Sequence, residues 1–289
     1  MQNNIGKIRN RGFEFSVNST NISNNSFTWK TDFNISFNKN KVLDLGVVKT
    51  IYSNWFYDSY CNVTMTNLPM AQLYGFKFVK IFQTQAEIDK APHFAGQLPG
   101  SAQYEDSNKD GTLDRLNCVP IGDPNPKYTG GMTNLFSYKN WDFNLTLSFA
   151  GDVDVLAIDT EATTRNLDGV FNVFADESER WRSLDQPGNG KYATSLYNTE
   201  KDRVGNSRMI YDGSFIKIQN LNVGYNFKNI KNINSCRVYC SVQNLYTFTK
   251  FPYGNPEVNY YGNSSLSRGV MCYDYPLSRT ISIGVNISF

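Results

Sequence analysis

Histidine and long apolar runs are what this sequence most lacks. His93 is the only histidine among 289 residues, so the chain can build neither a histidine-bearing catalytic triad nor a multi-histidine metal site. It follows Pro92, and we expect it in a surface loop. No stretch approaches the roughly 18 apolar residues that a transmembrane helix requires. A glycine-rich phosphate loop is also missing. The sequence therefore indicates no enzyme, and only strands remain as elements that could span a membrane.

Charge is also scarce and nearly balanced. The chain carries 28 Lys and Arg residues against 26 Asp and Glu residues, and its net charge is +2. That value is too small to indicate nucleic acid or anionic lipid as a partner. Aromatic residues nevertheless reach 15%, although the mean hydropathy is −0.45. This combination is typical of a wall with one apolar side and one polar side.

The cysteines show neither a paired metal-binding spacing nor an even count. Cys236 and Cys240 fall within one expected strand, where four steps of about 3.3 Å separate them too widely for a mutual disulfide. We expect all of them to act as small hydrophobic side chains. They are Cys61, Cys118, Cys236, Cys240 and Cys272.

Strict alternation of apolar and polar residues is the strongest positive signal. In residues 27–37, 141–149 and 281–289, every odd position is large and apolar except Thr31. A period of two puts the apolar side chains on one face of a strand and the polar ones on the other. A membrane strand of a barrel needs about 9–11 such residues, with one face toward lipid and one toward a wet lumen.

The pattern predicts an all-β fold of antiparallel transmembrane strands with long extracellular loops. We expect about eight strands, at residues 5–22, 27–37, 75–83, 128–138, 141–151, 213–227, 237–248 and 277–289. A phase slip predicts a bulge near Gln219 and Asn220. Within the long loops, Thr84 is expected to cap a short helix that ends before Pro92, and residues 176–184 to form an amphipathic helix.

The alternation also predicts which way the side chains of the strands point. One set is expected to face lipid: Phe33, Ile35, Leu145, Leu147, Ile283 and Val285. The opposite set, Asn34, Asn144 and Asn286, is expected to face the lumen. Aromatic residues crowd the strand ends, as in the girdles at the two membrane interfaces.

One acidic loop, DSNKDGTLDRLN at residues 106–117, could bind a metal ion. Its candidate calcium ligands are Asp106, Asn108, Asp110, the Thr112 carbonyl group and Asp114, with Gly111 at the sharp turn. Asn117 occupies the position where an EF-hand has its bidentate Glu. The alternatives are a structural calcium site and an Asx-rich surface turn stabilised by its own side chains. Asp152 and Asp154 offer a pair of carboxylates, but they follow a strand end and favour a hydrated loop.

Motifs along the whole chain carry a family resemblance. They are NIGKIRNRGFEFSV at 4–17, FTWKTDFNISFNKNKVLDLG at 27–46, PGSAQYEDSNKDGTLD at 99–114, GDPNPKYTGGMTNLFSYKNWDFNLTLSFAG at 122–151, YDGSFIKIQNLNVGYNF at 211–227, VYCSVQNLYTFTKFPYGNPE at 238–257 and YPLSRTISIGVNISF at 275–289. In this order they resemble the SusC/RagA-type TonB-linked outer membrane proteins. Asn117 stands where the family often has an acidic residue, and this departure argues against calcium binding at the loop.

The resemblance implies a barrel of about 22 strands around an N-terminal plug, energised by TonB and capped by a SusD-like surface lipoprotein. Such a protein imports oligosaccharides or peptides across the cell outer membrane. Residues 1–289 would be the C-terminal portion of the barrel, with the plug domain, TonB box and signal peptide outside this chain. Phe289 would end the assembly signal for the outer membrane. No cofactor is implied beyond the calcium ion.

The residues alone are also compatible with two other classes of protein. One is a stand-alone, porin-like barrel of eight strands, and the other is a soluble β-rich carbohydrate-binding module. A plug domain upstream of Met1 would separate the first of these from the importer. Solubility without detergent would favour the module.

Overall fold

A single long antiparallel sheet dominates the computed structural model of the chain. The structure describes residues 6–56, 59–158, 172–194, 205–228, 230, 232–262, 264–272 and 274–289. The sheet has seven strands in the order β1-β2-β9-β10-β13-β14-β16. Their bounds are β1 Lys7–Ser23, β2 Phe27–Asp44, β9 Tyr128–Tyr138, β10 Trp141–Gly151, β13 Phe215–Phe227, β14 Ser235–Thr249 and β16 Thr280–Ser288. We call this sheet the wall.

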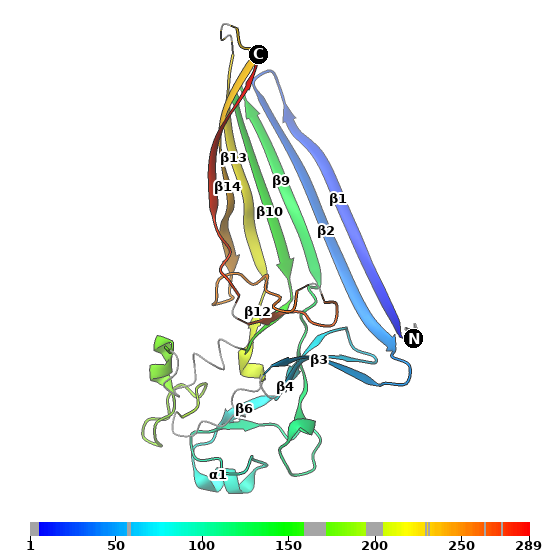
Figure 1. The fold of residues 1–289 in the computed structure, drawn as a ribbon, viewed down its shortest axis with the longest axis vertical. Coiled ribbons are helices and arrows are strands. Elements are labelled where there is room, and N and C mark those ends of the chain that lie inside the picture. Colours follow the sequence, from blue (N-terminus) through cyan, green and yellow to red (C-terminus); the bar gives the residue numbers. More distant parts are fainter. Residues whose placement is uncertain are drawn as a thin grey trace.

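The two ends of the wall differ in how its strands are connected. At one end, short turns join β1 to β2, β9 to β10 and β13 to β14. The Asn24 side-chain oxygen closes the first of these turns by accepting the amides of Ser26 and Phe27 at 3.0 and 2.8 Å. Long connections gather at the other end, beside the N-terminus (Figure 1). Short periplasmic turns and long extracellular loops are the two ends of an outer-membrane barrel.

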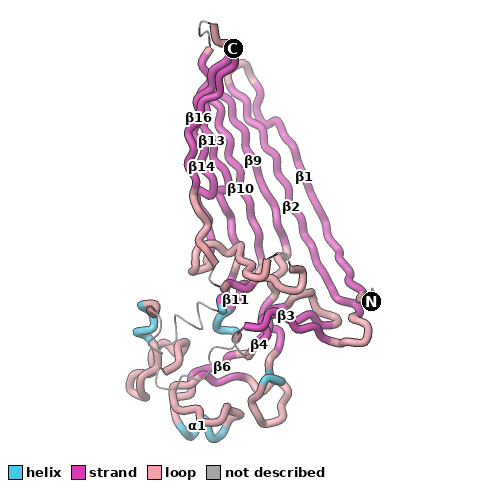
Figure 2. Tube along the Cα trace, in the orientation of Figure 1, coloured by secondary structure: helices cyan, strands magenta, loops and turns pink. Residues whose placement is uncertain are grey.

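The long connections fold into a layer of their own, which we call the loop layer (Figure 2). One of its sheets has the order β3-β4-β5-β8, another β12-β11-β15, and a third pairs β6 with β7. The bounds are β3 Thr50–Phe56, β4 Ser59–Met65, β5 Gln72–Gly75, β6 Phe78–Ile81, β7 Ala102–Tyr104, β8 Val119–Gly122, β11 Asp154–Ala157, β12 Ile210–Asp212 and β15 Val270–Met271. Helical elements are α1 Gln85–Lys90, η1 Arg115–Asn117, η2 Ala175–Glu179 and η4 Ser207–Met209.

Among the described residues, nearly all buried hydrophobic side chains belong to the loop layer. One cluster packs Phe76, Tyr104 and Trp181 together, and another packs Leu73, Leu156 and Met209. Val42 is the one buried hydrophobic residue of the described chain that lies within a wall strand. The loop layer therefore has ordinary hydrophobic cores, whereas the wall has polar residues on one face and exposed apolar residues on the other.

Seven of the eight expected strands belong to the wall, and one expectation was wrong. Residues 75–83 contribute only the four-residue β6 to a small sheet of the loop layer. Three of their apolar residues, Phe76, Ile81 and Phe82, are at most 2% exposed because they pack inside the loop layer, whereas Val79 is 50% exposed. The expected bulge in β13 is confirmed, since the register shifts between Ile218 and Asn220.

The two expected helices had different outcomes. The helix after Thr84 is α1, and the Thr84 hydroxyl accepts the Glu87 amide as expected of a cap. The Glu87 carboxylate accepts the Gln83 amide in return, and this bond and the one from Lys80 lower the pKa of Glu87. The expected helix at 176–184 is only the single turn η2, and Trp181 beyond it is buried in the core. No described helix is both long enough and apolar enough to cross a membrane.

Candidate functional site

Strand pairing sorts the side chains of the wall onto two chemically opposite faces. Residues paired across antiparallel strands share a face, so each row of pairs can be followed across the sheet. One row runs Phe33, Met132, Leu147, Ile218 and Tyr246. The neighbouring row runs Asn34, Gly131, Ser148, Lys217 and Thr247. The rows alternate in this way along the wall, and we call the two sides the apolar face and the polar face.

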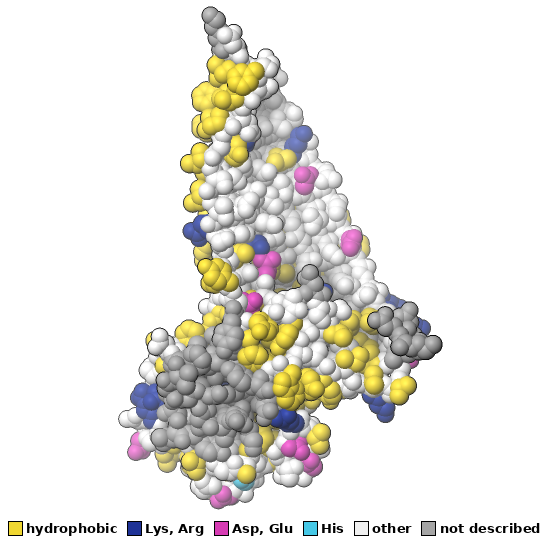
Figure 3. All heavy atoms as spheres, viewed as in Figure 1, with side chains coloured by type: hydrophobic (Ala, Val, Ile, Leu, Met, Phe, Trp, Pro, Cys, Tyr) yellow, Lys and Arg dark blue, Asp and Glu magenta, His cyan; other side chains and the backbone are white. Residues whose placement is uncertain are grey.

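The structure confirms that the two sets of side chains distinguished by the alternation lie on opposite faces of the wall. Phe33, Ile35, Leu145, Leu147, Ile283 and Val285 lie on the apolar face, and Asn34, Asn144 and Asn286 lie on the polar face. The side of the wall turned toward the viewer in Figure 3 is almost free of hydrophobic side chains, which appear along its left edge. Ile281 and Ile283 are 65% and 80% exposed, so the described part of the chain leaves this stretch of the apolar face uncovered.

Aromatic residues mark both ends of the apolar face. Near the short turns, the Trp29 and Phe136 rings stack with centroids 5.7 Å apart, and Trp141 meets Tyr225 at 4.9 Å. At the loop end, the Phe37 ring lies 6.0 Å from the Tyr128 ring, which also covers Gly151. Two aromatic bands separated by aliphatic residues are the pattern of a barrel surface that meets two membrane interfaces.

The polar face carries a hydrogen-bonded ion pair near the short turns. Arg237 on β14 reaches across β13 and donates to both carboxylate oxygens of Asp142 on β10, at 3.0 and 2.5 Å. The same guanidinium donates to Asn222 at 2.8 Å, and Asn226 donates to Asp142 at 2.8 Å. A Cβ atom on the intervening Gly224 would lie 2.5 Å from the guanidinium, so glycine is what lets Arg237 lie flat on the sheet.

This network forms one side of a hollow of about 530 Å³ on the polar face. Lys30, Ser137 and Asn144 add an ammonium group, a hydroxyl group and an amide to its lining. Fixed charges and amides of this kind are typical of a water-filled barrel interior and would be costly against lipid.

A second ion pair ties a loop to the loop end of the polar face. Lys217 projects from β13 and pairs with Glu257, which belongs to the connection between β14 and β15. The Lys217 side chain is only 9% exposed, because this connection folds over it. The pair therefore holds the segment around Glu257 inward, above the polar face.

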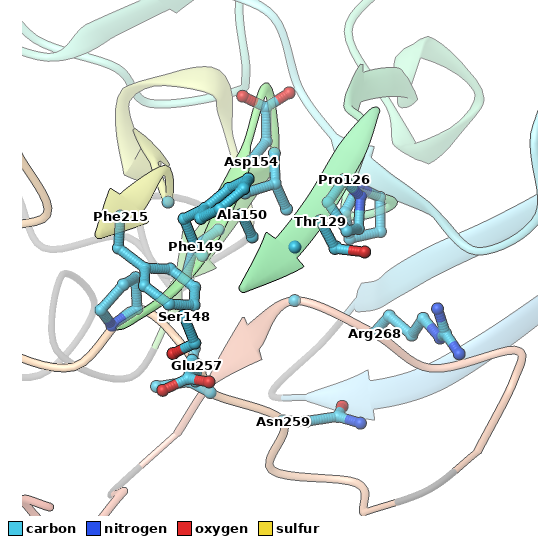
Figure 4. Close-up of a pocket in the computed structure, with 18 of the residues that line it drawn as sticks. Pro126, Thr129, Ser148, Phe149, Ala150, Asp154, Phe215, Glu257, Asn259 and Arg268 are labelled. Carbon is cyan, nitrogen blue, oxygen red and sulfur yellow. The ribbon is translucent and has the colours of Figure 1, made fainter. Parts of the chain in front are cut away.

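Beneath that segment, the wall and the loop layer enclose a hollow of about 570 Å³, which we call the mouth hollow (Figure 4). Ser148, Phe149 and Phe215 line it from the wall, while Glu257, Asn259 and Arg268 line it from the loops. The Ser148 hydroxyl and the Asn259 side-chain oxygen are buried there without a hydrogen-bond partner in this structure. The mouth hollow thus offers a carboxylate, a guanidinium and two buried polar atoms beside the Phe215 ring, which suits a polar organic ligand. Sequence reasoning missed it, because loop folding brings its residues together.

The acidic loop at 106–117 is held together by its own side chains. Asp106 accepts the amides of Lys109 and Gly111, both at 2.9 Å, and Asp110 accepts the amide and hydroxyl of Thr112, which lower the pKa of Asp110. The Asn117 amide group donates to the side-chain oxygens of Asp106 and Asn108, both at 2.9 Å. Asn117 is fully buried, and its own oxygen accepts the Asp114 amide. Its amide group points at two of the oxygens expected to bind calcium.

The other titratable residues singled out in the sequence do not converge on a reactive centre. Asp152 pairs with Lys127, whereas Asp154 accepts the Asp123 amide at 2.8 Å and is half buried, and this burial raises its pKa. His93 is exposed, and its ring nitrogen lies 2.9 Å from the Ala91 carbonyl oxygen. Over the described ranges, no three His, Cys, Asp or Glu side chains form a group suited to a metal ion. Cys61, Cys118 and Cys272 are buried, as expected of small hydrophobic side chains, whereas Cys236 is half-buried and Cys240 is exposed.

Comparisons with known proteins point to one family. No family model matches the chain. It is 31% identical over 300 residues to the TonB-dependent receptor P3 of Formosa agariphila, covering 99% of this chain and 29% of that receptor. It is 25% identical over 303 residues to the TonB-dependent receptor SusC of Bacteroides thetaiotaomicron, covering 100% of this chain and 27% of SusC.

A solved structure agrees with these relatives. The RagAB peptide transporter matches with a TM-score of 0.76 at 18% identity, over 99% of this chain and 30% of that one. The antiparallel barrel fold and the family resemblance are thereby confirmed. The chain spans less than a third of the length of each of these proteins.

Proposed function

We propose that this chain, which is similar along its whole length to SusC/RagA-type TonB-dependent receptors, forms the C-terminal part of the barrel of an outer-membrane nutrient importer. Its seven wall strands take their place in a barrel of about 22 strands. The loop layer stands on the extracellular side and contributes to the mouth. The protein acts as a transport component and not as an enzyme.

The segregation of side chains in the wall is the observation that carries this proposal. Each row across the sheet is mainly apolar or mainly polar, and the polar rows hold the Asp142–Arg237 network. A soluble carbohydrate-binding module would have to cover its apolar face, yet the described chain leaves Phe13, Trp141 and Ile283 at least half exposed. Lipid on that face and water on the other satisfy both sets of side chains.

The partners and ligand follow from the family. A SusD-like surface lipoprotein covers the extracellular mouth, TonB engages the protein through a part outside this chain, and the imported ligand is an oligosaccharide or a peptide. The mouth hollow of about 570 Å³ supports a polar ligand, because Glu257, Asn259 and Arg268 are among the residues that line the space between loops and wall.

The test uses the full-length parent protein with an affinity tag in its native host. We expect the parent to fractionate with the outer membrane, to co-purify with a surface lipoprotein and to support TonB-dependent uptake of labelled oligosaccharides or oligopeptides. Recovery of the parent in the soluble fraction would contradict the proposal. A second result would favour a stand-alone barrel instead, namely refolding of residues 1–289 in detergent into a monodisperse, heat-resistant species.

A further inference from the structure

The first two wall strands extend past the rest of the sheet and change character as they do so. Phe37 is paired with Tyr128, where β9 begins, but β2 continues to Asp44 and stays paired with β1. On the apolar face, the first two residue pairs of this extension are all basic. Arg11 is paired with Lys39, and Arg9 is paired with Lys41. They lie on the same face as Phe13 and Phe37, in the next two rows of that face. We call these four residues the rim cations.

The height of the rim cations relative to a membrane follows from strand geometry. From Phe27 to Phe37 the apolar face of β2 covers ten residue steps. Ten steps of about 3.4 Å, tilted by about 40°, give a band about 26 Å tall, which matches the lipid-facing band of a membrane barrel. Lys39 and Lys41 then stand about 5 and 10 Å above that band, at the depth of the polar headgroups. Since the long connections are at this end, the headgroups are those of the outer leaflet.

Three acidic residues lie near the rim cations, and in the described part of the chain none of them forms an ion pair with one. Asp123 lines a hollow together with Arg11 and Lys39, and its carboxylate accepts the Asn125 amide at 3.0 Å. Glu14 lies on the opposite face, where it accepts the Ser36 hydroxyl, and Asp44 accepts the Gly46 amide. Within the described chain, no carboxylate forms an ion pair with Arg9, Arg11, Lys39 or Lys41, and all of them except Lys41 are exposed. Lys and Arg side chains are visible at this corner of the molecule in Figure 3. Four unpaired positive charges therefore face the membrane surface together.

We propose that the rim cations bind the phosphate groups of the phosphorylated glycolipid in the outer leaflet. Two arginines present planar donors that suit phosphate oxygens, and two lysines add mobile ammonium groups. The aromatic side chains of Phe13 and Phe37, just below, pack against the acyl chains of the same lipid. The occupant is a lipid and not a free anion, because the site is continuous with the apolar band. A net charge of +2 over the chain conceals this local cluster.

This inference rests on the proposed membrane location, and its test separates the two. The full-length protein is purified in a zwitterionic detergent and titrated with the phosphorylated glycolipid and with its dephosphorylated form, with native mass spectrometry as the readout. The test variant combines Arg9→Gln, Arg11→Gln, Lys39→Gln and Lys41→Gln. The control variant loses the same charge at exposed cations away from the rim: Lys30→Gln, Lys90→Gln, Arg182→Gln and Lys228→Gln.

We expect the wild type and the control variant to bind the phosphorylated glycolipid at least about tenfold more tightly than the test variant does. Removing the lipid phosphates should weaken binding to the wild type by a similar factor, and inorganic phosphate at millimolar concentration should not compete. Equal binding by the test variant, or an equal loss in the control variant, would overturn the inference. Competition by inorganic phosphate would also overturn it by indicating a free-anion site. Membrane fractionation of the same variants reports on location separately.

Discussion

Thr31 on β2 donates a hydrogen bond of 2.8 Å to the side-chain oxygen of Asn134 on β9, within the apolar face of the wall. The indole nitrogen of Trp29 donates to the same oxygen at 3.0 Å. Asn134 is only 7% exposed. Thr31 is the one polar residue at an odd position of the alternating segments, and its partner explains why it is tolerated there. If the apolar face meets lipid as proposed, a polar group on it needs an internal partner, and the neighbouring strand supplies one.

Replacing only Asn134 should destabilise the protein more than replacing Asn134 and Thr31 together. We expect Asn134→Leu in the full-length protein to lower the free energy of unfolding by about 1–2 kcal/mol, because it leaves both the Thr31 hydroxyl and the Trp29 indole without this acceptor. Adding Thr31→Val should restore the part of the loss that comes from the unpaired Thr31 hydroxyl, while the part from the Trp29 indole remains. Urea titration of the barrel in lipid vesicles measures both values. Additive effects in the double variant would show that the two residues are not coupled.

The stability of the loop layer should depend on pH through two aspartates whose pKa values are shifted in opposite directions. Burial raises the pKa of Asp154, so its ionisation costs stability as pH rises through that raised value. The Ser214 hydroxyl and amide lower the pKa of Asp212, so its ionised form contributes stability that is lost as pH falls through the lowered value. We expect Asp154→Asn to raise the thermal unfolding midpoint of the full-length protein at neutral pH. At acidic pH, where Asp154 is protonated in both the folded and the unfolded state, the midpoint should not change.

Asp212→Asn serves as the matched control for the pH experiment. It should lower the unfolding midpoint at neutral pH, and this difference should fade as pH falls. Thermal unfolding followed by intrinsic fluorescence between acid and neutral pH gives both curves. A gain from Asp154→Asn that did not depend on pH would contradict the assignment to ionisation.

Calcium binding at residues 106–117 remains a prediction, and Asn117 gives a way to test it. If calcium binds Asp106, Asn108, Asp110, Thr112 and Asp114, the Asn117 amide group must turn away from Asp106 and Asn108. Asn117→Asp would place an acidic ligand at the twelfth position. We expect this variant to bind calcium more tightly than the wild type, and Asp110→Ala to bind it less tightly. Isothermal titration that detects no heat for either wild type or Asn117→Asp would refute the site.

Phe289 is predicted to end the assembly signal of the barrel. Its side chain is 84% exposed beyond β16, so its loss removes little packing within this chain. A stability effect alone would amount to at most about 1.5–3 kcal/mol. A strand that adds to an exposed edge of the assembly machinery would instead depend on its last side chain. We expect deletion of Phe289 from the full-length parent to shift most of the protein from the outer membrane to the periplasm, and Phe289→Trp to preserve insertion.

The wall could be predicted from the sequence because its environment is simple. In the proposed barrel, lipid on one side and water on the other impose a period of two. The expected bounds 128–138 and 141–151 agree to the residue with β9 and β10. The loop layer could not be predicted in this way. Its strand β4 is buried on both faces, so Cys61, Asn62 and Val63 show no alternation. The mouth hollow and the Arg237–Asp142 pair depend on contacts between residues far apart in the chain.

The most direct test of the central claim compares two adjacent residues of β10 in the full-length parent. Leu145 lies on the apolar face and Asn144 on the polar face, at nearly the same depth. We predict that Leu145→Arg lowers the free energy of unfolding in lipid vesicles by about 2–4 kcal/mol, because it puts a charge against the bilayer interior, and that Asn144→Arg lowers it much less. Equal tolerance of arginine at both positions would contradict a wall with one face in lipid.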